Sequence, residues 1–207
     1  MLTIEKLTFK ETFVLLVLSN SEKLKISYEV YYMYKISGDM PLSSEQYMEL
    51  YDESKKFECM EKAINKLSGR GCSVDELRRN LKKKDFSEKH IEETLEYMKK
   101  KGYLNDYSYS MNFVKDRLKS GKYGKNLIVR DLYKKGIDRN IIKKAIKESG
   151  ANFTDNDELY KLAMKKYLSV KDKDNPLAKV SNYLVNRGFD YESINKVLRQ
   201  IKSEIKS

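Results

Sequence analysis

The residues best suited to chemistry in this 207-residue chain are clustered lysines and arginines. Cations of this kind contact phosphate oxygens and acidic protein surfaces. Stacked repeats would bring equivalent cations into a basic stripe along one face, and a solvated basic surface with no partner is the alternative. The candidates for a surface that binds a partner protein or DNA are Arg78, Arg79, Lys82, Lys83, Lys122, Lys125, Arg130, Lys134, Lys135, Lys143 and Lys144.

Residue types that support catalysis or metal binding are sparse. The single histidine is His90, and the two cysteines are Cys59 and Cys72. His90 lies in the charged segment SEKHIEE, where no catalytic triad can be argued, and the Cys and His spacing does not form a metal site. We therefore expect a protein without enzymatic activity, metal or cofactor, with both thiols free in a reducing cytoplasm.

The segment GKYGKN, residues 121–126, could contact a phosphate in another way. It is not a P-loop, because the four-residue gap and the Lys-Ser/Thr ending are absent. It matches the GxxG pattern with which KH domains grip a nucleic-acid backbone, but helices rather than strands are expected around it. A loop that offers N–H groups to a phosphate and a loop that only joins two helices both remain open.

The charge is unevenly distributed along the chain, whose formal net charge is +11. Residues 1–56 hold 7 Lys and Arg against 9 Asp and Glu, whereas residues 57–150 hold 24 against 14. Residues 151–207 hold 11 against 8, so the last part of the chain is less basic than the middle. The basic field after residue 56 should raise encounter rates with polyanions.

The first quarter of the chain reads as a small strand-containing segment. Two or three short strands, in a hairpin or small sheet, are expected among residues 3–8, 13–18 and 24–27, followed by a helix over 28–36. Charged residues precede the apolar run 13–18, which is too short to span a bilayer, so neither a signal peptide nor a membrane span is expected.

From residue 44 the apolar period is helical, and the later part of the chain repeats itself. Four apolar columns recur at intervals of about 50 residues, which indicates a tandem helical array. The columns are Leu81, Leu132 and Leu184; Phe86, Ile137 and Phe189; Ile91, Ile142 and Ile194; and Leu95, Ile146 and Leu198. The sequence therefore predicts a mainly α protein with a small N-terminal β-containing extension, residues 1–56, and three three-helix repeats over 57–105, 106–154 and 155–207.

Each repeat has turn and capping residues at matching positions between its helices. Glycine in the turn before the third helix permits a left-handed backbone, which aspartate tolerates less well. The matching residues are Asp85, Gly136 and Gly188 in that turn; Ser87, Asp138 and Asp190 as caps of the third helix; and Ser73, Gly124 and Asn175-Pro176 at the start of the second helix.

The segment KKGYLNDYSYS, residues 100–110, is expected to join the first two repeats. Gly102 can take the left-handed cap of the preceding helix, and Asn105 or Asp106 can cap the next one. This segment is therefore predicted to be a hinge rather than an active-site loop.

Residues 100–146 resemble the central signature of the RecX family, the bacterial regulators of the RecA recombinase. The matching pieces are Gly102–Asp106, the aromatic-rich helix after them, Gly124, Leu132 and Lys135-Gly136-Ile137. The resemblance extends over residues 57–201, and the N-terminal part resembles the small extension of the Gram-positive branch. Asp85 departs from the pattern, since the other two repeats have glycine at that position.

The resemblance implies a non-enzymatic negative regulator, a cytoplasmic monomer that binds the RecA filament on single-stranded DNA. It would inhibit strand exchange and ATP hydrolysis, and so dampen DNA repair and the SOS response. Some members of the family also bind DNA directly, so single-stranded or double-stranded DNA is a further expected partner.

The alternative is a DNA-binding transcription factor built on helix-turn-helix-like pairs. Its recognition helices would begin SEKHIEE, DRNIIKK and DYESINK. Base readout favours Asn, Gln or Arg early on such a helix, and two of the three begin with acids or tyrosine, which argues against this alternative.

Overall fold

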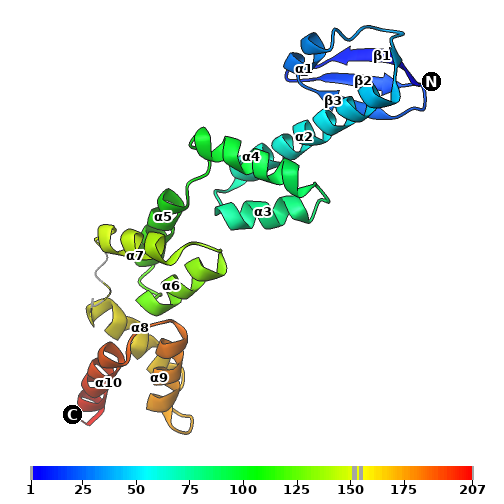
Figure 1. The fold of residues 1–207 in the computed structure, drawn as a ribbon. Coiled ribbons are helices and arrows are strands. Elements are labelled where there is room, and N and C mark those ends of the chain that lie inside the picture. Colours follow the sequence, from blue (N-terminus) through cyan, green and yellow to red (C-terminus); the bar gives the residue numbers. More distant parts are fainter. Residues whose placement is uncertain (1, 151–152, 154–155, 207) are drawn as a thin grey trace. The chain divides into compact units, whose positions relative to one another are not determined.

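The computed structural model describes residues 2–150, 153 and 156–206, and it is mainly helical with a small N-terminal sheet (Figure 1). The chain divides into two compact units. The first comprises Met1–Cys72 and Glu76–Leu104, and the second comprises Ser73–Asp75 and Asn105–Ser207. The predicted fold class, a helical array with a strand-containing extension, is confirmed.

The first unit begins with a four-stranded antiparallel sheet in the order β3-β2-β1-β4. Its strands are β1 (Leu2–Phe9), β2 (Val14–Leu18), β3 (Lys23–Ile26) and β4 (Pro41–Leu42). Buried residues alternate along β2, where Val14, Leu16 and Leu18 are wholly inaccessible. One face of the sheet is therefore packed, as strand alternation requires. The three expected strands are present, and β4 was not predicted.

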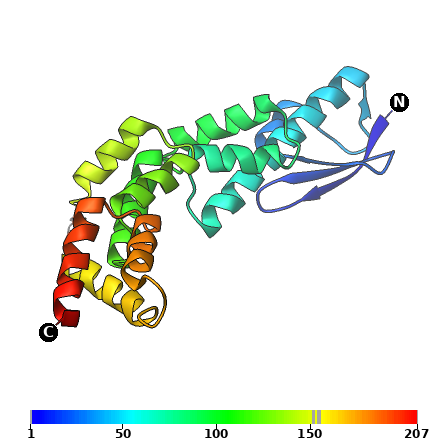
Figure 2. The same cartoon turned by 90° about the horizontal axis from the view of Figure 1, so that it is seen from below.

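Helix α1 (Tyr28–Met33) lies between β3 and β4 in the chain, and helix α2 (Ser44–Gly69) follows β4. Ser43 and Gln46 form a capping box at the start of α2, with reciprocal bonds of 3.1 and 3.0 Å. The first half of α2 buries Leu50 in the core of the sheet, and its second half packs against α4 (Figures 1 and 2). One continuous helix therefore joins the extension to the first repeat, and the boundary expected after residue 56 lies inside it.

The remaining helices of the first unit are α3 (Val74–Lys82), whose first two residues belong to the second unit, and α4 (Glu88–Lys100). The Ser87 hydroxyl accepts a hydrogen bond of 3.2 Å from the His90 N–H and so caps α4. The apolar columns behave as expected here, because the side chains of Leu81, Ile91 and Leu95 are wholly buried.

The second unit holds two three-helix groups. The first group is α5 (Asp106–Lys119), α6 (Lys125–Lys134) and α7 (Arg139–Glu148), and the second is α8 (Asn156–Leu168), α9 (Pro176–Asn186) and α10 (Tyr191–Lys206). Leu132, Ile142, Leu184 and Ile194 are at most 2% exposed, so the columns mark the core of each group. The boundary expected between residues 154 and 155 lies outside the described residues.

The segment that follows α4 has the geometry of a joint between helices. Gly102 takes a positive φ of 76°, as expected of a left-handed helix cap. The Asn105 side chain caps α5 by accepting from the Ser108 N–H at 3.0 Å. Asp106 instead accepts a hydrogen bond of 2.8 Å from the Val74 N–H, at the start of α3.

Asp190 provides a test of helix capping through the pH dependence of stability. The Ser193 N–H donates to the Asp190 carboxylate at 2.8 Å, and this hydrogen bond holds the pKa of Asp190 below its usual range. A depressed carboxyl pKa contributes stability above the unfolded pKa of about 3.9, which is lost as the pH falls through the folded pKa. We expect Asp190→Ala to lower the free energy of unfolding by about 1 kcal/mol at pH 7.

Urea unfolding at pH 7 and at acidic pH measures this contribution. The difference between the wild type and Asp190→Ala should shrink in acid, because the protonated carboxyl is a weaker acceptor. Asp190→Asn is the control, since an amide oxygen caps the helix without titrating. A cost of Asp190→Ala that is the same at both pH values would contradict the assignment.

Candidate surface for a polyanionic partner

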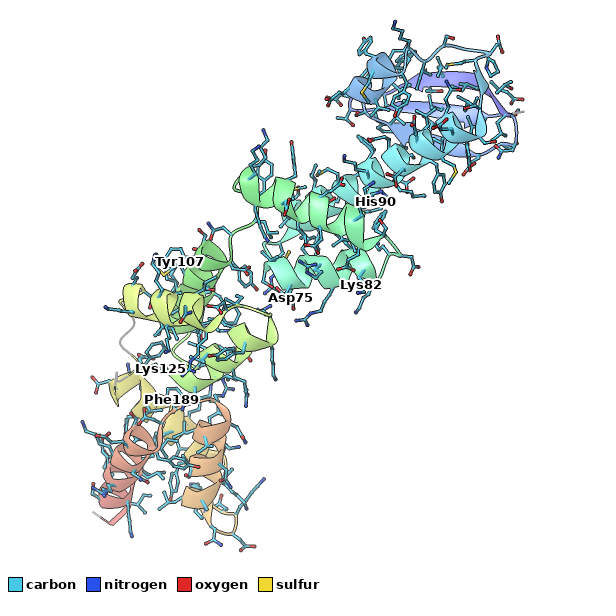
Figure 3. The ribbon with its side chains drawn as sticks, in the orientation of Figure 1. Asp75, Lys82, His90, Tyr107, Lys125 and Phe189 are labelled. Carbon is cyan, nitrogen blue, oxygen red and sulfur yellow. The ribbon has the colours of Figure 1, made fainter. Side chains whose placement is uncertain are left out.

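The four candidate cations near α3 all belong to the first unit. Arg78 forms ion pairs with Glu88 and Glu92 of α4, and Lys82, labelled in Figure 3, lies 3.3 Å from the Glu88 carboxylate. Arg79 and Lys83 are exposed. Three of these cations lie on α3 and Lys83 follows its last residue, and the sequence did not reveal that α4 supplies acids to two of them. Their charge is therefore partly neutralised within the protein.

The candidate cations of the second unit lie on α6, α7 and the loop before α6. Lys122, Lys125, Arg130, Lys134 and Lys143 are exposed. Among the described residues, Lys125, Arg130 and Lys143 have no acidic partner within ion-pair distance. These three cations on α6 and α7, together with Lys122 in the loop before α6, therefore remain available to an anionic partner. A continuous stripe from α3 to α7 stays a prediction.

Two candidate cations instead lie over aromatic rings. The Lys135 ammonium is 5.5 Å from the Tyr109 ring centroid and 5.8 Å from that of Phe113, and Lys144 is 4.9 Å from Tyr107. Lys135 is also half-buried. Such contacts stabilise the fold through cation–π attraction. These ring contacts and its partial burial make Lys135 a weaker candidate for a partner contact than the sequence alone suggests.

Two arginines that were not predicted extend this pattern of cations and rings. Arg117 lies 4.3 Å from the Tyr123 ring centroid, and Arg187 lies 5.8 Å from the same ring and 4.8 Å from Tyr183. The spacing of Tyr109, Phe113 and Arg117 at four-residue intervals on α5 was the available sequence signal. These side chains connect the two helical groups of the second unit.

The backbone of the GKYGKN loop decides between its two interpretations. The Gly124 N–H donates to the Arg187 carbonyl at 2.8 Å, and the Asn126 N–H donates to the Gly188 carbonyl at 3.0 Å. Gly124 is buried. These two N–H groups are therefore used inside the protein and do not face a phosphate. Lys122 and Lys125 can still contribute charge, because their side chains are exposed.

His90 has a structural role on α4. Its side chain is 6% exposed, and its Nε2 lies 2.8 Å from Asp52 Oδ1 on α2 (Figure 3). The pKa of Asp52 lies below its ordinary value, first because Lys89 donates a hydrogen bond to it and further because of His90. The buried Cys59 thiol contacts the backbone carbonyl of His90 rather than its ring, and burial raises the pKa of that thiol. A histidine, an aspartate and a cysteine thus lie close together without the geometry of an activated nucleophile.

Within the described residues, no three His, Cys, Asp or Glu side chains form a group that could hold a metal ion. In the same part of the chain, none of the helices has the length and apolar character needed to cross a membrane.

The fold and this surface define the class of protein, which is a tandem array of three-helix units that exposes unpaired cations. Two family models match the chain. The model of the first three-helix domain of RecX matches residues 59–98, and that of the second three-helix domain matches residues 105–146. Regulatory protein RecX of Clostridium perfringens (strain 13 / Type A) is 30% identical over 177 residues, covering 84% of this chain and 82% of that protein. The chain therefore belongs to the RecX family of regulatory proteins.

Further relatives agree with this assignment. Regulatory protein RecX of Finegoldia magna is 29% identical over 207 residues, covering 94% of this chain and 97% of the relative. A crystal structure of regulatory protein RecX superposes with a TM-score of 0.72 at 17% identity, covering 95% of this chain and 98% of the other. The crystal structure of RecX from Lactobacillus salivarius superposes with a TM-score of 0.61 at 23% identity, covering 72% of this chain and 97% of the other. At these identities the two structures support the fold alone.

Proposed function

We propose that this protein is a non-enzymatic negative regulator of RecA. It binds the RecA filament on single-stranded DNA as a cytoplasmic monomer, and it inhibits strand exchange and ATP hydrolysis. Membership of the RecX family supports the regulatory role. The observation that carries the binding mode is the set of exposed, unpaired cations Lys125, Arg130 and Lys143 in the second unit.

The physical basis of this binding is the repeated charge of the filament. Phosphates recur along single-stranded DNA, and each cation that neutralises one of them releases a counterion. Binding of this kind weakens steeply as salt rises, and it requires cations that the protein has not already neutralised. The three unpaired cations meet that requirement better than Arg78 and Lys82, which contact acids of α4.

A filament assay tests the function. RecA is assembled on circular single-stranded DNA, and ATP hydrolysis is followed as the protein is added. The wild type should slow hydrolysis at amounts stoichiometric with RecA or below. If hydrolysis continues at its full rate with stoichiometric protein, RecA inhibition is not the activity of this chain.

A triple charge reversal tests the surface in the same assay. Lys125→Glu/Arg130→Glu/Lys143→Glu should require about tenfold to a hundredfold more protein for half-inhibition, because three cation–phosphate contacts become repulsive. The matched control reverses three exposed cations of the last helical group, Lys171 and Lys173 in the turn between α8 and α9 and Lys202 on α10. Both variants carry the same net charge. Equal loss of inhibition in the two would indicate a general charge effect, and no loss in the first would show that the surface is elsewhere.

A further inference from the structure

A tight turn in the second unit receives the start of another helix. The turn between α9 and α10 contains Gly188, and the carbonyls of Arg187 and Gly188 accept hydrogen bonds from the N-terminus of α6. A Cβ atom on Gly188 would lie 2.1 Å from the backbone nitrogen of Leu127, and one on Gly124 would lie 2.3 Å from the Gly188 carbonyl. The approach of the two backbones therefore depends on glycine at this turn.

A second turn of the same unit receives a helix start in the same way. The Ser73 hydroxyl, just before α3, donates to the Lys135 carbonyl at 2.5 Å. A Cβ atom on Gly136 would lie 2.4 Å from the Asp75 Cβ (Figure 3 labels Asp75). Ser73 and Gly124 are matching positions, as are Lys135 and Arg187. We call this arrangement the repeat joint: the start of the second helix of one repeat placed on the tight turn of the following repeat.

The first repeat has a turn of the same shape between α3 and α4. The Lys84 N–H donates to the Leu81 carbonyl at 2.9 Å, and the Asp85 N–H donates to the Lys82 carbonyl at 3.1 Å. The corresponding amides of Lys135 and Gly136 make the same two bonds, at 3.1 and 2.9 Å.

The difference between these turns lies in the residue at the left-handed position. Asp85 has a φ of 60°, against 73° at Gly136 and 83° at Gly188. A side chain in this region costs free energy that glycine avoids, so aspartate is not the residue that the local backbone prefers. Asp85 is exposed, and it carries a Cβ at the position where Gly136 and Gly188 lack one and a helix start approaches closely.

In a repeat joint the helix start is the donor and the tight turn is the receptor. The third repeat has a helix start that no following repeat in the chain receives. Asn175 and Pro176 begin α9, in the place that Ser73 and Gly124 hold in the first two repeats. In a second copy of this chain, the matching receptor for that start would be the turn at Asp85. Donor and receptor are different surfaces, so docking between copies would be head to tail, which gives an open chain unless the rotation between copies closes a ring.

We propose that Asp85 prevents the start of α9 of a second copy of this chain from docking on the turn between α3 and α4. Its side chain prevents the repeat joint from forming between molecules, and so keeps the array of one chain from extending into an open polymer. Capping of a terminal repeat is a general requirement of stacked arrays. This inference rests on the geometry of the joints and does not depend on RecA.

Sedimentation velocity over a range of concentrations tests the proposal with full-length variants. Asn175, before α9, has a left-handed φ of 49°, whereas Gly124, which occupies the matching position in the observed repeat joint, has a φ of −78°. A glycine at position 175 can adopt either conformation, so the test also replaces Asn175. Asp85→Gly/Asn175→Gly should therefore associate, with a sedimentation coefficient that rises with concentration. The control Asp85→Ala/Asn175→Gly differs only by one Cβ atom, and it should sediment as a monomer, as should the wild type.

Three results would overturn the proposal. The first is a double-glycine variant that stays monomeric at every concentration. The second is a control with alanine at position 85 that associates equally, because the Cβ atom would then not be the barrier. The third is head-to-tail association of the wild type itself. Circular dichroism melts of each variant identify any loss of fold, and association of an unfolded variant would count against the proposal.

Discussion

Gly188→Ala is expected to lower the free energy of unfolding of the second unit by about 2–5 kcal/mol, which is a large fraction of the stability of a small domain. Two effects combine at this residue. Gly188 has a φ of 83°, where a Cβ atom costs about 1–2 kcal/mol. The added Cβ would also lie 2.1 Å from the Leu127 nitrogen, so α6 must move away from the turn.

Movement of α6 would break the joint between the two helical groups. The hydrogen bonds donated by Gly124 and Asn126 would be lost, and each is worth about 0.5–1.5 kcal/mol net. Urea unfolding followed by circular dichroism measures the total. Hydrogen exchange should show faster exchange at the amides of Gly124 and Asn126 in the variant.

Gly150→Ala separates the two effects. Gly150 also has a positive φ, of 64°, but a Cβ atom there would meet nothing within 4 Å. This control should therefore show only the backbone strain of about 1–2 kcal/mol. If Gly188→Ala costs no more than Gly150→Ala, the joint is not formed in solution.

The repeat joint shows which part of this fold could be read from the sequence. The apolar columns predicted the helices and their cores, because burial of one helix face requires a fixed spacing. Leu132 and Leu184 are wholly buried as a result. Aspartate at position 85 was visible as a departure from glycine, but its reason was not. Glycine at positions 136 and 188 is explained by a close approach of a helix start distant in sequence, which a local pattern cannot contain.

The candidate surface was predicted less completely than the fold. The sequence names the candidate cations, but whether a cation is available depends on which neighbouring helix supplies an acid. Arg78 meets Glu92, fourteen residues further along, only because α3 and α4 lie side by side. In the same way, the sequence leaves open whether the amides of the GKYGKN loop are available, and Arg187, 63 residues from Gly124, accepts one of their hydrogen bonds. Tertiary contacts between residues this far apart determine which cations and amides are available to a partner, and helical periodicity in the sequence does not reveal them.

The extension shows the limit of strand prediction. Alternating apolar residues predict the strands β1 and β3, and a short run of apolar residues predicts β2. The two-residue strand β4, Pro41–Leu42, carries no such alternation. Proline is tolerated there because β4 lies at an edge of the sheet, where β1 is its one partner strand.

Leu132→Ala is expected to cost about 2–5 kcal/mol, because it removes a wholly buried side chain from the core of α5–α7. The more informative expectation concerns where the damage appears. In a stacked array, each repeat is stabilised by its own core and by the joint with its neighbour. Leu132 lies in the same compact unit as α8–α10, whereas the sheet and α4 belong to the other unit.

Hydrogen exchange should therefore accelerate in α5–α7 and, to a smaller degree, in α8–α10, while the amides of β1, β2 and β3 stay protected. Leu81→Ala is the matched variant, since Leu81 holds the same column in the first unit and is also wholly buried. It should give the opposite distribution, with acceleration concentrated in α3 and α4. Uniform acceleration along the whole chain in both variants would mean that the protein unfolds as one cooperative body, and that the repeat joint transmits stability across every repeat.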